Sequence, residues 1–228
     1  MLSDTRRSIL KLTKSDWEEQ KPYWSYEDIG LFSLILTALS AILDLLAHLH
    51  LLPRSERDHP GLVLQLTVIV LLMLALYLVL KLRYRQAVLR PLGWIWPRAA
   101  FVIIAPLLGG FSAAGVALCL HGYAHDPRTT PLVGFLVLGL ILGPVLEESF
   151  FRGCLLPVLA CGLGTTSAVI LTAFLFALFH GPANLVQWLL FSGTGTAYGW
   201  IRVMSRSTTA AALAHAAYNL VLILFARP

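Results

Sequence analysis

Charged residues are scarce in this sequence. Of its 228 residues only 13% are Asp, Glu, Lys or Arg, whereas 57% are hydrophobic. A typical soluble domain carries roughly 25% charged residues, so the composition excludes a soluble globular protein of this size. The mean hydropathy of +0.76 instead predicts a chain that lies in a lipid bilayer.

Cysteines are few, and one common nucleophile motif is missing. Cys119, Cys154 and Cys161 all lie in apolar stretches, which argues against a disulfide framework and favours a packing role. The sequence contains no GxSxG pattern, and no histidine stands at a readable spacing from Cys154. Nothing here therefore indicates a serine or cysteine nucleophile.

Apolar residues gather in seven segments that are separated by Pro- and Gly-containing breaks. A hydrocarbon core of roughly 30 Å requires about 20 apolar residues per helix. The sequence therefore predicts an all-α, polytopic integral membrane protein with about seven transmembrane helices. The expected segments are residues 29–52, 61–82, 99–121, 131–160, 164–180, 183–203 and 206–226.

The positive charges indicate how these helices are oriented. With the N-terminus inside, the leading segment and the 81–98 loop each place five Lys or Arg residues on the cytoplasmic side, joined by Arg202 and Arg206. Only four would lie outside, with Arg152 set aside as part of a motif. This asymmetry predicts an N-in, C-out topology. We interpret the net charge of +5 as this topology signal, so no nucleic-acid partner is expected.

The first 28 residues differ from the rest of the chain. They carry many charges and lack a signal-peptide cleavage pattern, so we expect residues 1–28 to be a cytoplasmic N-terminal segment. Apolar residues among its lysines would also suit a short interfacial helix. The transmembrane domain then covers residues 29–228.

The fourth segment is too long for a straight membrane crossing. Its 30 residues would form a helix about 45 Å long, well beyond the hydrocarbon core. Pro144 is the predicted kink in this helix. Such kinks are tolerated in membranes where neighbouring groups satisfy the freed backbone atoms.

Three ionisable residues follow this proline, in the sequence GPVLEESFFRG at 143–153. An ionisable residue at membrane depth costs at least a few kcal/mol, so it marks a cavity, a partner or a function. Glu148 and Arg152 are four residues apart, in the order that favours an ion pair, which could equally be a structural link between helices. Glu147 points about 100° away around the helix and lacks that partner, which makes it the better candidate for a general base.

Further polar residues lie in the later spans. His180 ends the run FALFH, and His215 and Asn219 share one helix face at i and i+4. Counted at about 1.5 Å per residue from the predicted inner helix ends, Glu147 and Asn219 lie about 20 Å deep. His180 and His215 lie about 24 Å and about 14 Å deep on the same count. Three separate spans are thus predicted to bring four polar groups into one layer.

The sixth segment has a different character, because small residues dominate it between Ser192 and Gly199. Small residues on a membrane helix let a neighbouring helix approach closely. They could equally leave room for a substrate. The sequence does not decide between these two interpretations.

In these stretches the sequence resembles the CPBP (Abi) family of intramembrane peptidases, which includes the type II CAAX prenyl endopeptidases. Three motifs, in the same order, carry the resemblance. GluGluxxxArg matches Glu147, Glu148 and Arg152; PhexxxHis matches Phe176 and His180; HisxxxAsn matches His215 and Asn219. The resemblance covers about residues 130–228, which would be the catalytic core.

The resemblance implies roles for these residues. Glu147 and His180 would activate a water for attack on a peptide carbonyl, with Glu148 and Arg152 in support. His215 and Asn219 would donate hydrogen bonds to the oxyanion. The predicted function is an intramembrane endopeptidase that acts on a membrane-anchored protein or peptide, in CAAX-type or C-terminal sorting-signal processing. No cofactor is expected.

Two other functions remain open. Two histidines and a carboxylate are also a common zinc ligand set, although the HExxH signature is missing. The chain could also be a non-enzymatic scaffold or a proton-coupled transporter that uses its buried carboxylates and histidines. In each case the lipid bilayer is a partner. We expect a multi-pass protein of the plasma (inner) membrane of a prokaryote.

Overall fold

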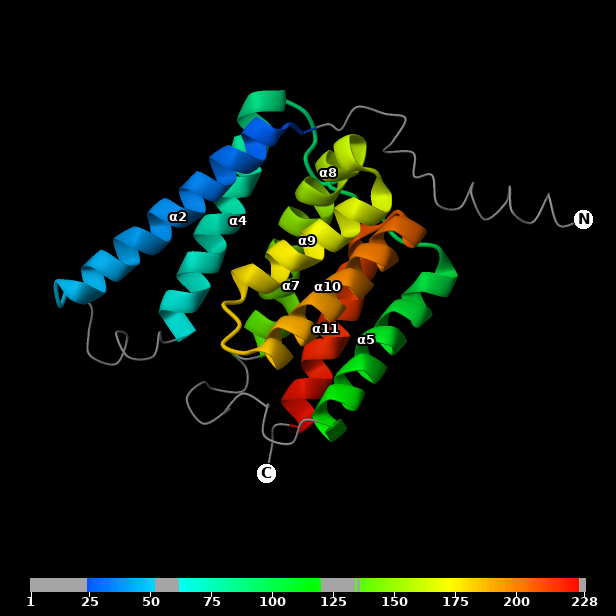
Figure 1. Ribbon diagram of the computed structural model, residues 1–228. Helices are drawn as coiled ribbons and strands as arrows, with labels where there is room; N and C mark the ends of the chain where they lie inside the picture. The colour runs from blue at the N-terminus through cyan, green and yellow to red at the C-terminus, as the bar shows by residue number, and fades with distance from the viewer. Residues whose placement is uncertain (1–23, 52–61, 120–133, 135, 226–228) are drawn as a thin grey trace, which may run out of the picture.

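The structure is a computed structural model, which describes residues 24–51, 62–119, 134 and 136–225. These residues form helices, without a strand among them, as predicted (Figure 1). The elements are α2 (Tyr26–His48), α4 (Leu62–Tyr84), α5 (Ala99–Cys119), η2 (Val137–Leu142), α7 (Gly143–Glu148), η3 (Ser149–Leu155), α8 (Leu156–Leu163), α9 (Thr165–Phe179), α10 (Leu185–Ser205) and α11 (Thr208–Phe225). Most of the expected N-terminal segment lies outside the described residues.

Four of these helices are long and apolar enough to cross a membrane. They are α2 (over Tyr26–Leu46), α4, α5 (over Ala99–Ala117) and α11, while α9 is apolar but has only 15 residues. Together they confirm the coarse prediction of an all-α, polytopic integral membrane protein. The count of seven spans and the N-in, C-out orientation remain predictions.

The long fourth segment is a composite helix. Two π-helical stretches, η2 and η3, alternate with the α-helical α7 and α8 as far as Leu163. Pro144 lies in the first turn of α7, and Pro157 lies in the first turn of α8. Pro144, the predicted kink, therefore lies two residues after the end of a π-helical stretch, an element that often occurs at functional sites.

Pro144 leaves a carbonyl of this helix without a backbone donor, because proline has no N–H. The Gly143 N–H donates to the Leu138 carbonyl, five residues back. On the same pattern Pro144 would have donated to Gly139. The side-chain amide of Asn219, from α11, donates to the Gly139 carbonyl instead, at 2.8 Å. Asn219 thus satisfies a backbone group that the proline frees.

A side chain from the N-terminal end of the described chain binds the backbone near the second proline. The Leu156 N–H still donates five residues back, to the Phe151 carbonyl, and on the α-helical pattern that follows Pro157 would have donated to Gly153, four residues back. The Trp24 indole N–H donates to the Gly153 carbonyl at 2.9 Å. A Cβ atom on Gly153 would lie 2.9 Å from the Leu92 carbonyl oxygen, so glycine also lets the connection at 85–98 pack against η3.

Small residues bring the helices of the C-terminal half into close contact. A Cβ on Gly195 in α10 would lie 3.0 Å from the Cα of Ala173 in α9. A Cβ on Gly109 in α5 would lie 2.0 Å from the Ala214 carbonyl oxygen in α11. Close helix approach in the sixth segment is therefore confirmed. The surrounding core joins η3, α8, α9, α10 and α11.

A second core joins α2 and α4 to the composite helix, on the opposite side from α5 (Figure 1). Cys154 is buried in this core without a disulfide bond, as its apolar context predicts. One end of the helix pair is tied by Asp28, which is buried and lies 2.6 Å from Nε of Arg83. The Tyr84 hydroxyl also donates to Asp28. These contacts hold α2 and α4 together beside the site-bearing helices.

The close contact between α5 and α11 predicts that one methyl group added at Gly109 lowers the stability of the fold. Gly109→Ala places a Cβ against the Ala214 carbonyl, so the helices must separate, and we expect a loss of about 1–3 kcal/mol in the free energy of unfolding. Gly115→Ala, in the same helix, is the control because nothing lies within 4 Å of its added Cβ. Denaturation in detergent micelles measures both, and equal stability of the two variants would contradict the packing described.

Candidate active site

Three of the predicted residues meet around the Glu147 carboxylate. His180 Nε2 lies 3.6 Å from Oε2 of Glu147, and His215 Nε2 lies 4.0 Å from the same oxygen. They come from α7, from the C-terminal cap of α9 and from α11. The side chains of Glu147 and His180 are 20% and 25% exposed, so neither is fully enclosed. The structure therefore brings these three side chains together, while their common depth in the membrane remains a prediction.

Local backbone features position Glu147 and His180. Gly143 lies one turn before Glu147, and a Cβ there would be 3.7 Å from Oε1 of Glu147, so the glycine leaves room for the carboxylate. His180 is held through Nδ1, which lies 2.8 Å from the Phe176 carbonyl oxygen. Its ring stacks on Phe191 from α10, with 4.7 Å between the ring centroids. Nε2 of His180 is thereby directed at Glu147.

Glu148 is the centre of a second, fully buried group. Arg152 Nη1 donates to Oε1 of Glu148 at 3.0 Å, and the predicted ion pair is therefore confirmed. His215 Nδ1 lies 2.9 Å from the same oxygen, a contact that the sequence reasoning missed. Arg152 also donates to the Gly195 carbonyl at 2.8 Å, which links the pair to α10. One carboxylate thus orients both the arginine and the histidine.

Aromatic rings line this buried group. The guanidinium carbon of Arg152 lies 4.6 Å from the ring centroid of Phe176 and 5.3 Å from that of Tyr198. Cation–π contact at these distances offsets part of the cost of burying the charge. Tyr198 also stacks on His215, with centroids 4.9 Å apart and planes 18° from parallel. The sequence reasoning missed this tyrosine. The one available signal was its position one turn after Gly195 in the small-residue segment.

Asn219 is placed differently from the other candidates. It follows His215 by one turn of α11, and its amide donates to the Gly139 carbonyl described above. This hydrogen bond ties Asn219 to the backbone of η2, and a role at the reaction centre stays a prediction. An amide nitrogen carries two hydrogens, so one remains for a second acceptor.

The residues of the described part of the chain include no group of three or more His, Cys, Asp or Glu side chains arranged to hold a metal ion. Glu147, His180 and His215 come nearest in type to a ligand set. The zinc alternative is therefore tested by removing metal from the protein, as described below.

Comparison with known families adds one finding. The family model described as Type II CAAX prenyl endopeptidase Rce1-like matches residues 129–221. Neither a curated protein nor a solved structure matches the chain. The match confirms the resemblance drawn from the three motifs, and it spans all of their residues.

Removal of the buried Glu148 charge should destabilise the protein far more than removal of the exposed Glu27 charge. Glu148→Gln leaves Arg152 buried without a counter-ion, so we expect a loss of about 3–5 kcal/mol in the free energy of unfolding. Glu27→Gln is the control, because its carboxylate pairs with Arg83 at 2.9 Å on an exposed surface, where such pairs contribute little. Denaturation in detergent micelles compares them. A Glu148→Gln variant as stable as the control would show that the buried pair is not required.

Proposed function

From the Rce1-like match over residues 129–221 and the geometry around Glu147, we propose that this chain is an intramembrane endopeptidase. The proposed enzyme hydrolyses a peptide bond of a membrane-associated substrate, and is of the glutamate type. The observation that carries the proposal is the partly exposed Glu147 carboxylate beside two imidazoles, in a membrane protein. Ionisable groups at membrane depth are too costly to persist without a use.

Glu147 and His180 are proposed to activate the attacking water. Oε2 of Glu147 is buried and accepts no hydrogen bond from the described residues, so it can accept one from a water. The 3.6 Å between this oxygen and His180 Nε2 is long for a direct hydrogen bond and allows a water to contact both groups. The carboxylate can then take the proton as the water oxygen attacks the carbonyl carbon. It returns that proton to the amine nitrogen when the peptide C–N bond breaks.

His215 and Asn219 are proposed to stabilise the oxyanion. Nδ1 of His215 is engaged by Glu148, which leaves Nε2 directed toward the Glu147 side of the site. With a proton on Nε2 as well, the imidazole of His215 donates to the developing oxyanion. The second amide hydrogen of Asn219 would be the other donor.

The substrate class follows from the family and the environment. The family name refers to CAAX prenyl endopeptidases, so a prenylated CAAX protein is one candidate substrate. A C-terminal sorting signal with an apolar membrane segment is the other. We propose one of these two anchored substrates for a seven-span, N-in, C-out enzyme of a prokaryotic plasma membrane.

Cleavage in liposomes tests the catalytic pair. The probes are an S-farnesylated peptide with a CAAX-type C-terminus and a peptide anchored by a C-terminal apolar helix, both biotinylated. Glu147→Gln and His180→Ala should each lower cleavage by at least about 100-fold, since each removes a group that acts on the water. Glu27→Gln, which changes an exposed carboxylate, is the control.

The same liposomes separate the peptidase from its non-enzymatic rival. Full proteolysis by both Glu147→Gln and His180→Ala would contradict the proposed mechanism. Absence of cleavage of either peptide by the wild type, together with a proton flux that Glu147→Gln abolishes, would favour the transporter.

Metal removal tests the zinc alternative. We expect cleavage to survive exhaustive treatment with a chelator, because the proposed chemistry needs only a carboxylate, two imidazoles and an amide. Residual metal is measured by elemental analysis of the treated protein. Cleavage that disappears on chelation and returns on addition of zinc would establish the metallopeptidase instead.

A further inference from the structure

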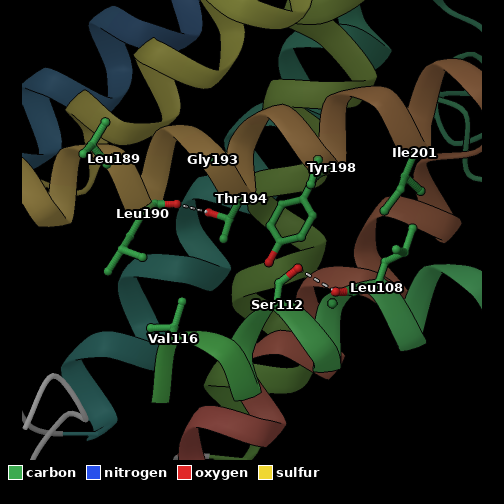
Figure 2. Close-up of a pocket in the computed structure, with 11 residues that line it drawn as sticks. Leu108, Ser112, Val116, Leu189, Leu190, Gly193, Thr194, Tyr198 and Ile201 are labelled. Carbon is green, nitrogen blue, oxygen red and sulfur yellow. Dashed lines mark hydrogen bonds between the residues drawn. The ribbon is translucent and has the colours of Figure 1, made fainter. Parts of the chain in front are cut away.

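An apolar groove of about 190 Å³ lies between α5 and α10 (Figure 2). Residues Leu108 to Val116 of α5 form one wall, and residues Leu189 to Ile201 of α10 form the other. The groove extends from Leu189, which is 64% exposed, to Tyr198, which is 2% exposed. It therefore leads from the outer surface of the helix bundle toward the interior.

Tyr198 connects this groove to the candidate active site. The tyrosine ring is held in place because it stacks on His215. Its hydroxyl is buried and has no hydrogen-bond partner among the described residues. Figure 2 shows the hydroxyl end on the side that faces α5, among the residues that line the groove. A buried hydroxyl without a partner is costly, so this donor indicates a ligand with an acceptor.

The other hydroxyls that line the groove are already engaged. Ser112 donates to the Leu108 carbonyl at 2.7 Å, within its own helix. Thr194 donates to the Leu190 carbonyl at 3.0 Å in the same manner. Tyr198 therefore supplies the unmatched donor in an otherwise apolar space.

The depth of Tyr198 narrows the choice of occupant. In the proposed seven-span arrangement α10 crosses the membrane, and Tyr198, about 10 Å from the end of α10 at Ser205, then lies inside the hydrocarbon layer. Acyl or prenyl chains offer no strong acceptor, and lipid ester groups lie at the interface rather than at this depth. A peptide segment that is not helical has free carbonyl oxygens and must find donors inside the membrane. Its carbonyls match the Tyr198 hydroxyl.

We propose that the α5–α10 groove binds the substrate segment next to the cleaved bond in extended form, and that Tyr198 donates a hydrogen bond to a backbone carbonyl of that segment. The proposal rests on the proposed peptidase function. Contact between Tyr198 and His215 places this segment beside the residues that would act on the bond. Tyr198 is thus a substrate-positioning residue, and the apolar walls select apolar side chains.

Gly193 offers a way to fill the groove without disturbing the helices. It lines the groove, and nothing lies within 4 Å of a Cβ built on it. Gly193→Leu therefore projects a side chain into the space that the peptide would occupy. Gly115 in α5 is equally open but does not line the groove, so Gly115→Leu is the matched control.

Photo-crosslinking measures occupancy separately from cleavage. A photoreactive amino acid replaces Val116, which lines the groove, in the inactive Glu147→Gln background. The same substitution at Phe111, which is 72% exposed and outside the groove, is the reference position. The probes are the two biotinylated anchored peptides in liposomes. We expect peptide adducts at position 116 and few at 111, and Gly193→Leu should lower the yield at least about tenfold while Gly115→Leu preserves it.

Tyr198→Phe tests the hydrogen bond itself, since phenylalanine keeps the ring that stacks on His215. With the active enzyme we expect kcat/KM to fall about tenfold, mainly through a higher KM, with an unchanged pH profile. A shifted pH profile with unchanged KM would instead show that the hydroxyl acts on the histidine. That result would overturn the assigned contact.

The remaining outcomes separate the groove from the peptidase. Cleavage of a probe without peptide adducts at position 116, or with adducts that Gly193→Leu does not reduce, overturns the groove proposal and leaves the peptidase standing. Adducts formed with lipid rather than with peptide overturn it as well. Peptide adducts in the groove without any cleavage by the wild type overturn the peptidase alone, and the absence of both adducts and cleavage overturns both proposals.

Discussion

The Glu148 carboxylate, which is fully buried, is bound by Arg152 and by His215. In a low-dielectric interior a charge of this kind persists only with partners in good geometry, so the three side chains fix one another. Through the Arg152 bond to the Gly195 carbonyl the same group also fixes α10 against the composite helix. The orientation of His215 toward Glu147, and therefore the geometry of the candidate site, depends on this one carboxylate.

A second constraint comes from the two prolines of the composite helix. Each proline removes a backbone donor, and the freed carbonyl needs a new one because lipid provides none. Asn219 donates a hydrogen bond to the Gly139 carbonyl, and Trp24 donates one to the Gly153 carbonyl. The irregular backbone that carries Glu147 and Glu148 is thus held from both flanks, by α11 and by Trp24, which lies two residues before α2. A helix shaped in this way can present two adjacent glutamates to different surroundings.

The candidate active site and the groove share one wall. Tyr198 contacts His215 on one side and lines the α5–α10 groove on the other. The small residues of α10 serve two purposes along one helix: Gly195 allows contact with α9, whereas Gly193 leaves the groove open. The two interpretations of the sixth segment, close packing and room for a substrate, are therefore compatible at different turns.

The sequence by itself determined the features that depend on composition or on contacts between residues close together in the chain. Hydropathy determined the membrane class and the helical fold, and i to i+4 spacing predicted the pair of Glu148 and Arg152, because both follow from helix geometry alone. Tertiary structure decided the contacts between helices: His215 with Glu148, Asn219 with the backbone, and Tyr198 with the groove. These depend on how each helix is rotated about its axis and on how closely neighbours pack, which apolar composition does not specify in a membrane.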